Sequence, residues 1–112
     1  MGIELRAEAR ITVSRRAALS AGEDWFPCMI VDASESGFAM VCTRPLVVEQ
    51  ILDFRCELYP QSFFECKIEI RHLHSDGAGV MITNIDDAAL ELWRSYVKDQ
   101  SFVSRAKGKA TK

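Results

Sequence analysis

The chain has 112 residues, which is the length of one ordinary domain. Its hydrophobic fraction of 48% and charged fraction of 27% are typical of a folded globular protein and argue against disorder. The formal net charge is −2, so the chain lacks the overall basic field of a DNA-binding protein, and any anion site has to be local.

The four cysteines, Cys28, Cys42, Cys56 and Cys66, lie within or beside apolar segments. No two of them form a C-x-x-C pair, so we expect buried reduced thiols, with neither a zinc site nor a disulfide framework. The N-terminus lacks the layout of a signal peptide, and no apolar run approaches the roughly 20 residues that span a bilayer. We therefore expect a cytoplasmic protein that does not insert into a membrane.

Strand patterns occupy most of the chain after a charged start. Segments rich in β-branched and aromatic residues, separated by turn residues, predict strands near residues 10–13, 25–31, 38–42, 50–58, 63–73 and 80–82. The strictest alternation lies in 63–73, where Phe64, Cys66, Ile68 and Ile70 share one face and charged residues the other. Residues 75–79 read as a hairpin turn.

The period changes after residue 85. Asp86 or Asp87 can cap a helix, because a carboxylate accepts hydrogen bonds from the free amides of the first turn. Apolar residues then recur at spacings of three and four, which predicts an amphipathic helix of about three turns; they are Ala89, Leu90, Trp93, Tyr96 and Val97. We expect a mainly β fold, a small antiparallel barrel at residues 10–99 that the helix covers, and a disordered basic tail at 100–112. A sandwich is the alternative from pattern alone.

Two segments carry candidate chemistry. The first is an N-terminal arm, residues 1–10, in which Arg6 and Arg10 lie four residues apart. Arginine offers planar, permanently charged donors that fit phosphate oxygens and stack on flat bases. A solvated charged end, with Glu8 as an internal partner, is the alternative for this arm.

The second segment is the loop 32–37, with Asp32, Ser34 and Gly37 at D-x-S-x-x-G spacing. It can be a plain turn, in which Asp and Ser bond to the backbone and glycine takes a positive φ. It can also be a binding wall, because a carboxylate accepts two hydrogen bonds from N1 and N2 of guanine and a glycine lets a ligand approach the backbone.

An R-x-x-x-R arm, a strand out and a strand back, and then D-x-S-x-x-G together resemble the signature of the PilZ domain family. The resemblance runs from about Arg6 to Val97 and includes the later strands and the final helix. It implies a six-stranded antiparallel β-barrel with a C-terminal helix that binds the bacterial second messenger cyclic di-GMP on its outer surface. Arg6 and Arg10 would grip the phosphates or a guanine, Asp32 would read a guanine edge, Ser34 would support the phosphate or base, and Gly37 would keep the wall low.

Other residues could add to that site or lie outside it. Family members often carry one more arginine at the position of Leu5, and its absence here favours one bound copy of the ligand over a stacked pair. Arg15 and Arg71 are possible additional contacts, and surface charge is the alternative for each. His72 and His74 lack a carboxylate or cysteine at metal spacing and are interpreted as surface residues.

The leading hypothesis is a non-enzymatic, cytoplasmic receptor or adaptor, expected as a monomer. It would bind cyclic di-GMP and signal to a protein partner in the control of motility, biofilm, pili or virulence, with no cofactor or metal and no DNA. The alternative is a PilZ-type protein-interaction module that does not bind nucleotide. A small enzyme is disfavoured, because we find no nucleophile–base pair, no metal set and no glycine-rich phosphate loop.

Overall fold

The computed structural model describes the backbone of residues 10–110 and the side chains of residues 10–101. Six strands are followed by one helix, as the sequence predicts. They are β1 (Ile11–Ser20), β2 (Trp25–Ala33), β3 (Gly37–Val41), β4 (Ile51–Tyr59), β5 (Ser62–Leu73), β6 (Gly77–Ile82) and α1 (Asp87–Ala110).

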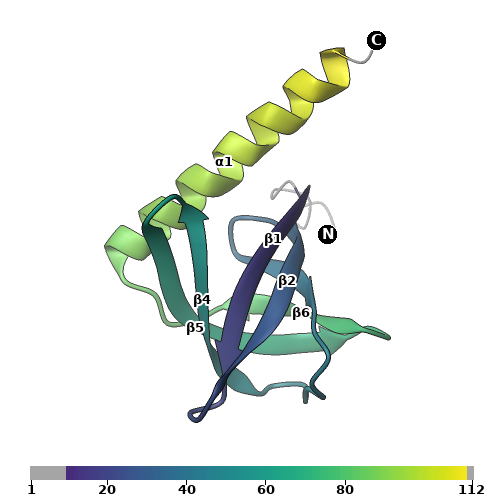
Figure 1. The fold of residues 1–112 in the computed structure, drawn as a ribbon, viewed down its shortest axis with the longest axis vertical. Coiled ribbons are helices and arrows are strands. Elements are labelled where there is room, and N and C mark those ends of the chain that lie inside the picture. Colours follow the sequence, from purple (N-terminus) through teal and green to yellow (C-terminus); the bar gives the residue numbers. More distant parts are fainter. Residues whose placement is uncertain (1–9, 111–112) are drawn as a thin grey trace, which may run out of the picture.

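The strands form a closed antiparallel barrel in the order β1-β2-β3-β6-β5-β4, with β1 and β4 pairing to close it (Figure 1). The alternation in β5 has the expected result: Phe64, Ile68 and Ile70 are buried, while Glu65 and Lys67 are exposed. The barrel therefore confirms the predicted fold class and excludes the sandwich.

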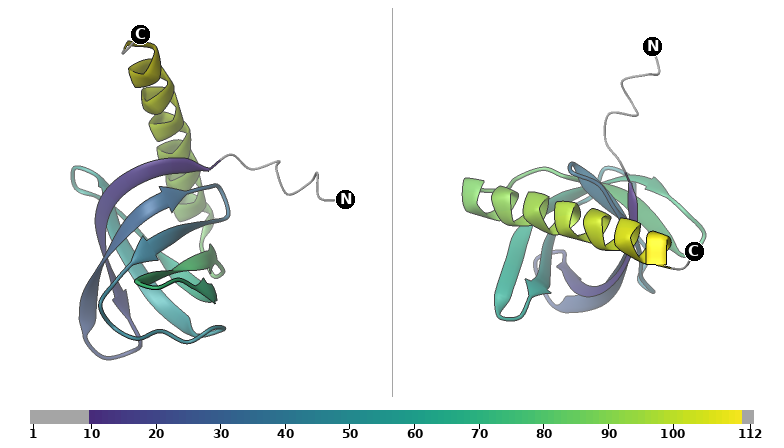
Figure 2. Two further views of the ribbon diagram at one scale, coloured as in Figure 1. Left: turned by 90° about the vertical axis from the view of Figure 1, so that its right-hand side faces the viewer. Right: turned by 90° about the horizontal axis from the view of Figure 1, so that it is seen from above.

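Helix α1 covers one end of the barrel and then projects beyond it (Figures 1 and 2). Trp93 is fully buried and fills this end, with its ring stacked on Phe64 at a centroid distance of 5.1 Å and tilted against Phe38 at 5.6 Å. Tyr96 and Val97 are buried on the same face of the helix. Strands and helix thus share one core, and removing the helix would uncover it.

The ends of α1 differ in how well the sequence predicts them. Asp86 is the cap, since its Oδ1 accepts a hydrogen bond from the Ala89 amide at 2.8 Å. The helix continues to Ala110, whereas we expected about three turns and a disordered tail from residue 100. Arg105, Ala106, Lys107 and Lys109 are good helix formers, and their local propensity favours continuing the helix.

Strand β6 begins at Gly77, earlier than the expected start at residue 80. Gly77 pairs with Val41, and a Cβ on it would lie 1.9 Å from the backbone oxygen of Met40. The glycines of residues 75–79 are therefore partly strand residues that allow β3 and β6 to approach, and not only turn residues.

All four cysteines are free thiols, with Cys28 and Cys56 buried and Cys42 and Cys66 half-buried. Burial raises the pKa of Cys28 and of Cys66 to about 12, and that of Cys56 to about 11. These thiols are therefore protonated at neutral pH and behave as small apolar groups. Within the described residues, no helix is both long and apolar enough to cross a membrane.

Candidate functional site

The two sequence motifs meet on the outside of the barrel, where Arg10 contacts Asp32. Arg10 lies just before β1, and its Nη2 and Nε lie 3.2 and 3.3 Å from Oδ2 of Asp32 in β2. The Arg10 side chain is 56% exposed and that of Asp32 34% exposed. This ion pair faces solvent, so it contributes little to stability but places a guanidinium and a carboxylate side by side.

Both contacts from Arg10 reach the same carboxylate oxygen of Asp32. The other oxygen, Oδ1, is buried and has no hydrogen-bond partner within the described part of the chain. Oδ2 is held only by the exposed Arg10, so a ligand that displaces the guanidinium reaches a carboxylate oxygen that can accept hydrogen bonds. That arrangement suits a ligand that brings its own N–H donors together with an anionic group.

Ser34 has a different position from the one we expected, because it is buried. Its hydroxyl and its amide both donate to the backbone oxygen of Gly37, at 3.3 and 2.9 Å. Its own backbone oxygen accepts a hydrogen bond from Nε1 of the buried Trp93 at 2.9 Å. Ser34 therefore closes the loop and ties it to α1, and its hydroxyl points to the loop's own backbone.

The position of Gly37 has no room for a side chain, because β6 lies too close to it. A Cβ on Gly37 would lie 2.1 Å from the backbone oxygen of Val80 in β6. Its φ is not positive, unlike that of Gly22, so the alternative of a positive-φ turn glycine is wrong. Gly37 keeps β3 close to β6, and its expected role in keeping the wall low beside a ligand stays a prediction.

The remaining candidate residues lie in different places. Arg6 lies outside the described residues. Arg15 in β1 points to the helix: its guanidinium carbon lies 5.6 Å from the centre of the Tyr96 ring, and a side-chain hydrogen bond to Tyr96 raises the pKa of Arg15. Arg71 in β5 is exposed, with Nη1 3.9 Å from Oε2 of Glu69. The structure therefore brings Arg10 and Asp32 together and places neither Arg15 nor Arg71 in contact with them.

Comparisons with known proteins identify the fold. The family model described as the PilZ domain matches residues 4–99. The chain belongs to the PilZ domain family. No curated protein matches the chain.

Two solved structures share the PilZ barrel. One is the Bacillus subtilis inhibitor of motility MotI/DgrA, with a TM-score of 0.72 and 14% identity over 87% of this chain. The other is the PilZ domain of CeSA from a cellulose-synthesizing bacterium, with a TM-score of 0.68 and 15% identity over 81% of this chain and 96% of that one. The present chain matches only 51% of the length of MotI/DgrA.

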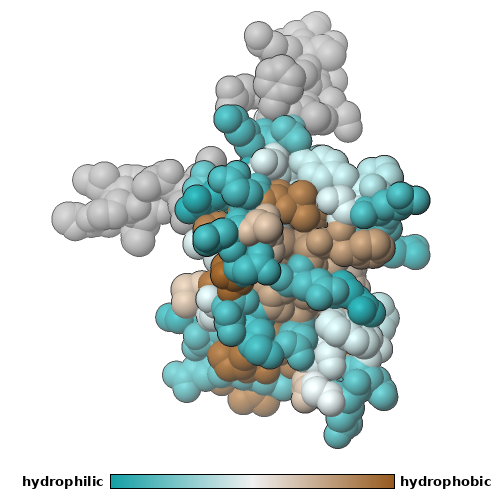
Figure 3. All heavy atoms as spheres, turned by 90° about the vertical axis from the view of Figure 1, so that its left-hand side faces the viewer, coloured by the Kyte–Doolittle hydropathy of each residue, from teal (hydrophilic) through white to brown (hydrophobic). Residues whose placement is uncertain are grey.

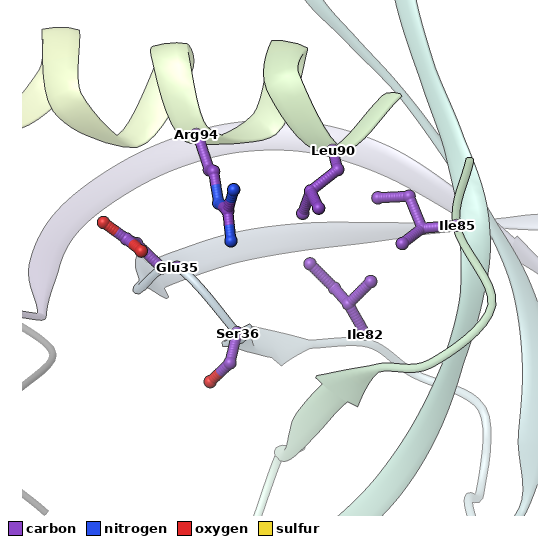
Figure 4. Close-up of a pocket in the computed structure, with 6 residues that line it drawn as sticks. All are labelled: Glu35, Ser36, Ile82, Ile85, Leu90 and Arg94. Atoms are coloured by element: carbon purple, nitrogen blue, oxygen red, sulfur yellow. The ribbon is translucent and has the colours of Figure 1, made fainter. Parts of the chain in front are cut away.

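A pocket that the sequence analysis did not predict lies on the other side of the loop of residues 32–37. It has a volume of about 220 Å³ between that loop and α1 (Figure 4). Its lining residues are Glu35, Ser36, Ile82, Ile85, Leu90 and Arg94. Glu35 and Ser36 lie inside the D-x-S-x-x-G motif, whose variable positions give no signal of this role. The loop of residues 32–37 therefore borders two regions. Asp32 lies beside Arg10 on the outer wall, whereas Glu35 and Ser36 line the pocket next to α1.

Proposed function

We propose that this PilZ domain is a receptor for cyclic di-GMP that signals to a protein partner. The observation that carries the proposal is the solvent-facing contact of Arg10 with Asp32, which places an exposed guanidinium beside a partly exposed carboxylate. Cyclic di-GMP carries two phosphate charges and two guanines. A guanidinium beside a carboxylate is complementary to both kinds of group.

The position of Arg10 beside Asp32 supports the following roles. Asp32 accepts hydrogen bonds from N1 and N2 of one guanine, while Arg10 turns from Asp32 to a phosphate. Arg6, four residues earlier, supplies a second guanidinium. Ser34 and Gly37 act indirectly, because their contacts with Trp93 and with β6 hold the loop that carries Asp32.

The output goes through a partner. Motility, biofilm, pili and virulence are the processes expected of such a receptor, and the likeness to an inhibitor of motility favours the first of them. The barrel exposes large apolar side chains that a partner can cover, with Val47 65% and Phe63 60% exposed. On the face in Figure 3, hydrophobic residues lie among hydrophilic ones and do not form one continuous surface patch.

Isothermal titration with cyclic di-GMP tests this function. We expect binding to the wild-type protein, and a loss of about tenfold or more in Arg10→Ala, because a charge-assisted hydrogen bond is worth about 1.5–3 kcal/mol. Asp32→Ala should lower the preference for cyclic di-GMP over cyclic di-AMP by about fivefold or more, since a bidentate base contact contributes about 1–3 kcal/mol of discrimination.

The matched control is Arg55→Ala, which removes an exposed arginine of β4 that lies over the Trp25 ring. It should bind like the wild type, while higher salt should weaken binding in both proteins. Absence of heat with the wild-type protein would refute nucleotide binding and favour the interaction module that binds no ligand.

A further inference from the structure

One row of residues crosses four strands on the outside of the barrel, with Asp32 at one end and His72 at the other. The strand register places Asp32 opposite Ala39, Ala39 opposite Gly79, and Gly79 opposite His72. Neighbouring strands lie about 4.8 Å apart, so the two ends are separated by about 14 Å. The middle of the row consists of the two smallest residues, which leaves a shallow floor between its ends.

The imidazole of His72 lies over this floor. A Cβ on Gly79 would be 2.4 Å from Nε2 and 2.6 Å from Cε1 of His72, so the ring occupies the space above the glycine backbone. The ring thus reaches from β5 across β6, in the direction of β3 and Asp32. His74 packs edge-on against it, with ring centres 4.9 Å apart and planes at 78°.

Backbone irregularities occur at both ends of the row. The register shifts between Ile30 and Asp32 in β2, and again between Ile70 and His72 in β5. In each case the strand has one extra residue, and the next residue is the end of the row. Bulges of this kind redirect side chains and are frequent beside binding sites.

We propose that His72 stacks on the second guanine of the ligand, while Asp32 reads the first. This inference rests on the proposed cyclic di-GMP binding. It adds to the two sequence motifs a stacking contact for the second guanine. A cyclic dinucleotide has two bases, and Asp32 can read only one of them. An aromatic ring at the far end of a floor without bulky side chains provides a stacking surface for the other.

The test is titration of three variants with cyclic di-GMP at one salt concentration. His72→Ala should weaken binding about fivefold or more, the range found when a stacked aromatic group is removed. His72→Phe keeps a flat ring and should bind within about twofold of the wild type. Phe63→Ala removes an exposed aromatic ring near the other end of β5 and should leave binding unchanged.

A second measurement observes His72 in the wild-type protein itself. The chain has two histidines, so tag-free protein gives two imidazole Cε1–H signals, and the one missing in His72→Phe belongs to His72. Stacking on guanine should move the His72 signal upfield on saturation with cyclic di-GMP.

The outcomes separate the two proposals. If the wild-type protein binds, while His72→Ala binds equally well and the His72 signal stays in place, the stacking role is wrong and the receptor function stands. If the wild-type protein shows no binding, the receptor function fails and the stacking role fails with it.

Discussion

Two arginines close together at the start of the barrel have opposite surroundings. Arg10 lies on the outer wall, where it contacts Asp32 and solvent. Arg15 lies at the junction between barrel and helix, where it packs over Tyr96 and has a buried Nε. The same side chain therefore belongs to a candidate binding site in one case and to the attachment of α1 in the other.

Strand parity explains this difference. Within β1, Val13 and Leu19 are buried, and Arg15 shares their parity, so it points toward the core end that α1 covers. Arg10 shares the parity of the exposed Thr12 and points outward. Breaking the exposed Arg10–Asp32 contact costs little free energy, so Arg10 can turn to a ligand. The contacts at the junction between barrel and helix stabilise the fold. Mutations in the two regions should therefore separate binding from stability.

The largest effect is expected at the junction, from Trp93→Ala. Trp93 is fully buried against Phe38 and Phe64, so the substitution leaves a cavity and should lower the free energy of unfolding by about 3–5 kcal/mol. Urea denaturation measures this loss. Trp93→Phe keeps most of the ring but removes the hydrogen bond to the Ser34 oxygen, so it should cost less. A stability equal to the wild type in Trp93→Ala would show that the helix does not close the barrel.

The next prediction exchanges the two arginines for methionine one at a time. Arg15→Met should lower stability by about 1 kcal/mol, through the lost contact with Tyr96, and leave cyclic di-GMP binding unchanged. Arg10→Met should leave the melting temperature nearly unchanged and weaken binding, because an exposed ion pair contributes about 0–1 kcal/mol. Thermal melts and titration on both proteins check the pair. If Arg15→Met is the variant that loses binding, the site extends to the junction. The separation between a binding outer wall and a stabilising junction is then wrong.

The fold could be predicted from local patterns. The alternation in β5 and the three-and-four spacing around Trp93 each reflect one buried face, and a buried face is visible in a short window of sequence. The bulges in β2 and β5 depend on pairing between distant strands, so no short window shows them.

The candidate site could be predicted only in part, and its motif shows why. Arg10 and Asp32 are charged and exposed, so their chemistry and their place agree with the pattern. Ser34 and Gly37 have residue types that suit a ligand, but their positions are decided by Trp93 and by the Val80 oxygen, which lie far away in the sequence. His72 has no motif around it, and only the register connects it to Asp32.

The smallest effect is expected at the outer edge of the junction, where Tyr59 donates a hydrogen bond of 2.6 Å to Asp99 of α1. Burial, followed by this hydrogen bond, raises the pKa of Tyr59 to about 12.

A tyrosine in the unfolded chain ionises near pH 10, so the unfolded state loses its proton first as the pH rises. The stability linked to Tyr59 is therefore complete below about pH 10 and is lost as the pH rises toward 12. The thiols of Cys28, Cys56 and Cys66 act in the same direction from about pH 9, because their pKa values are also raised. Tyr59→Phe should lower stability slightly at pH 7 and flatten its decline between pH 10 and 12, which chemical denaturation across that range measures. An equally steep decline in wild type and variant would assign the alkaline loss to the thiols and leave Tyr59 without a part in it.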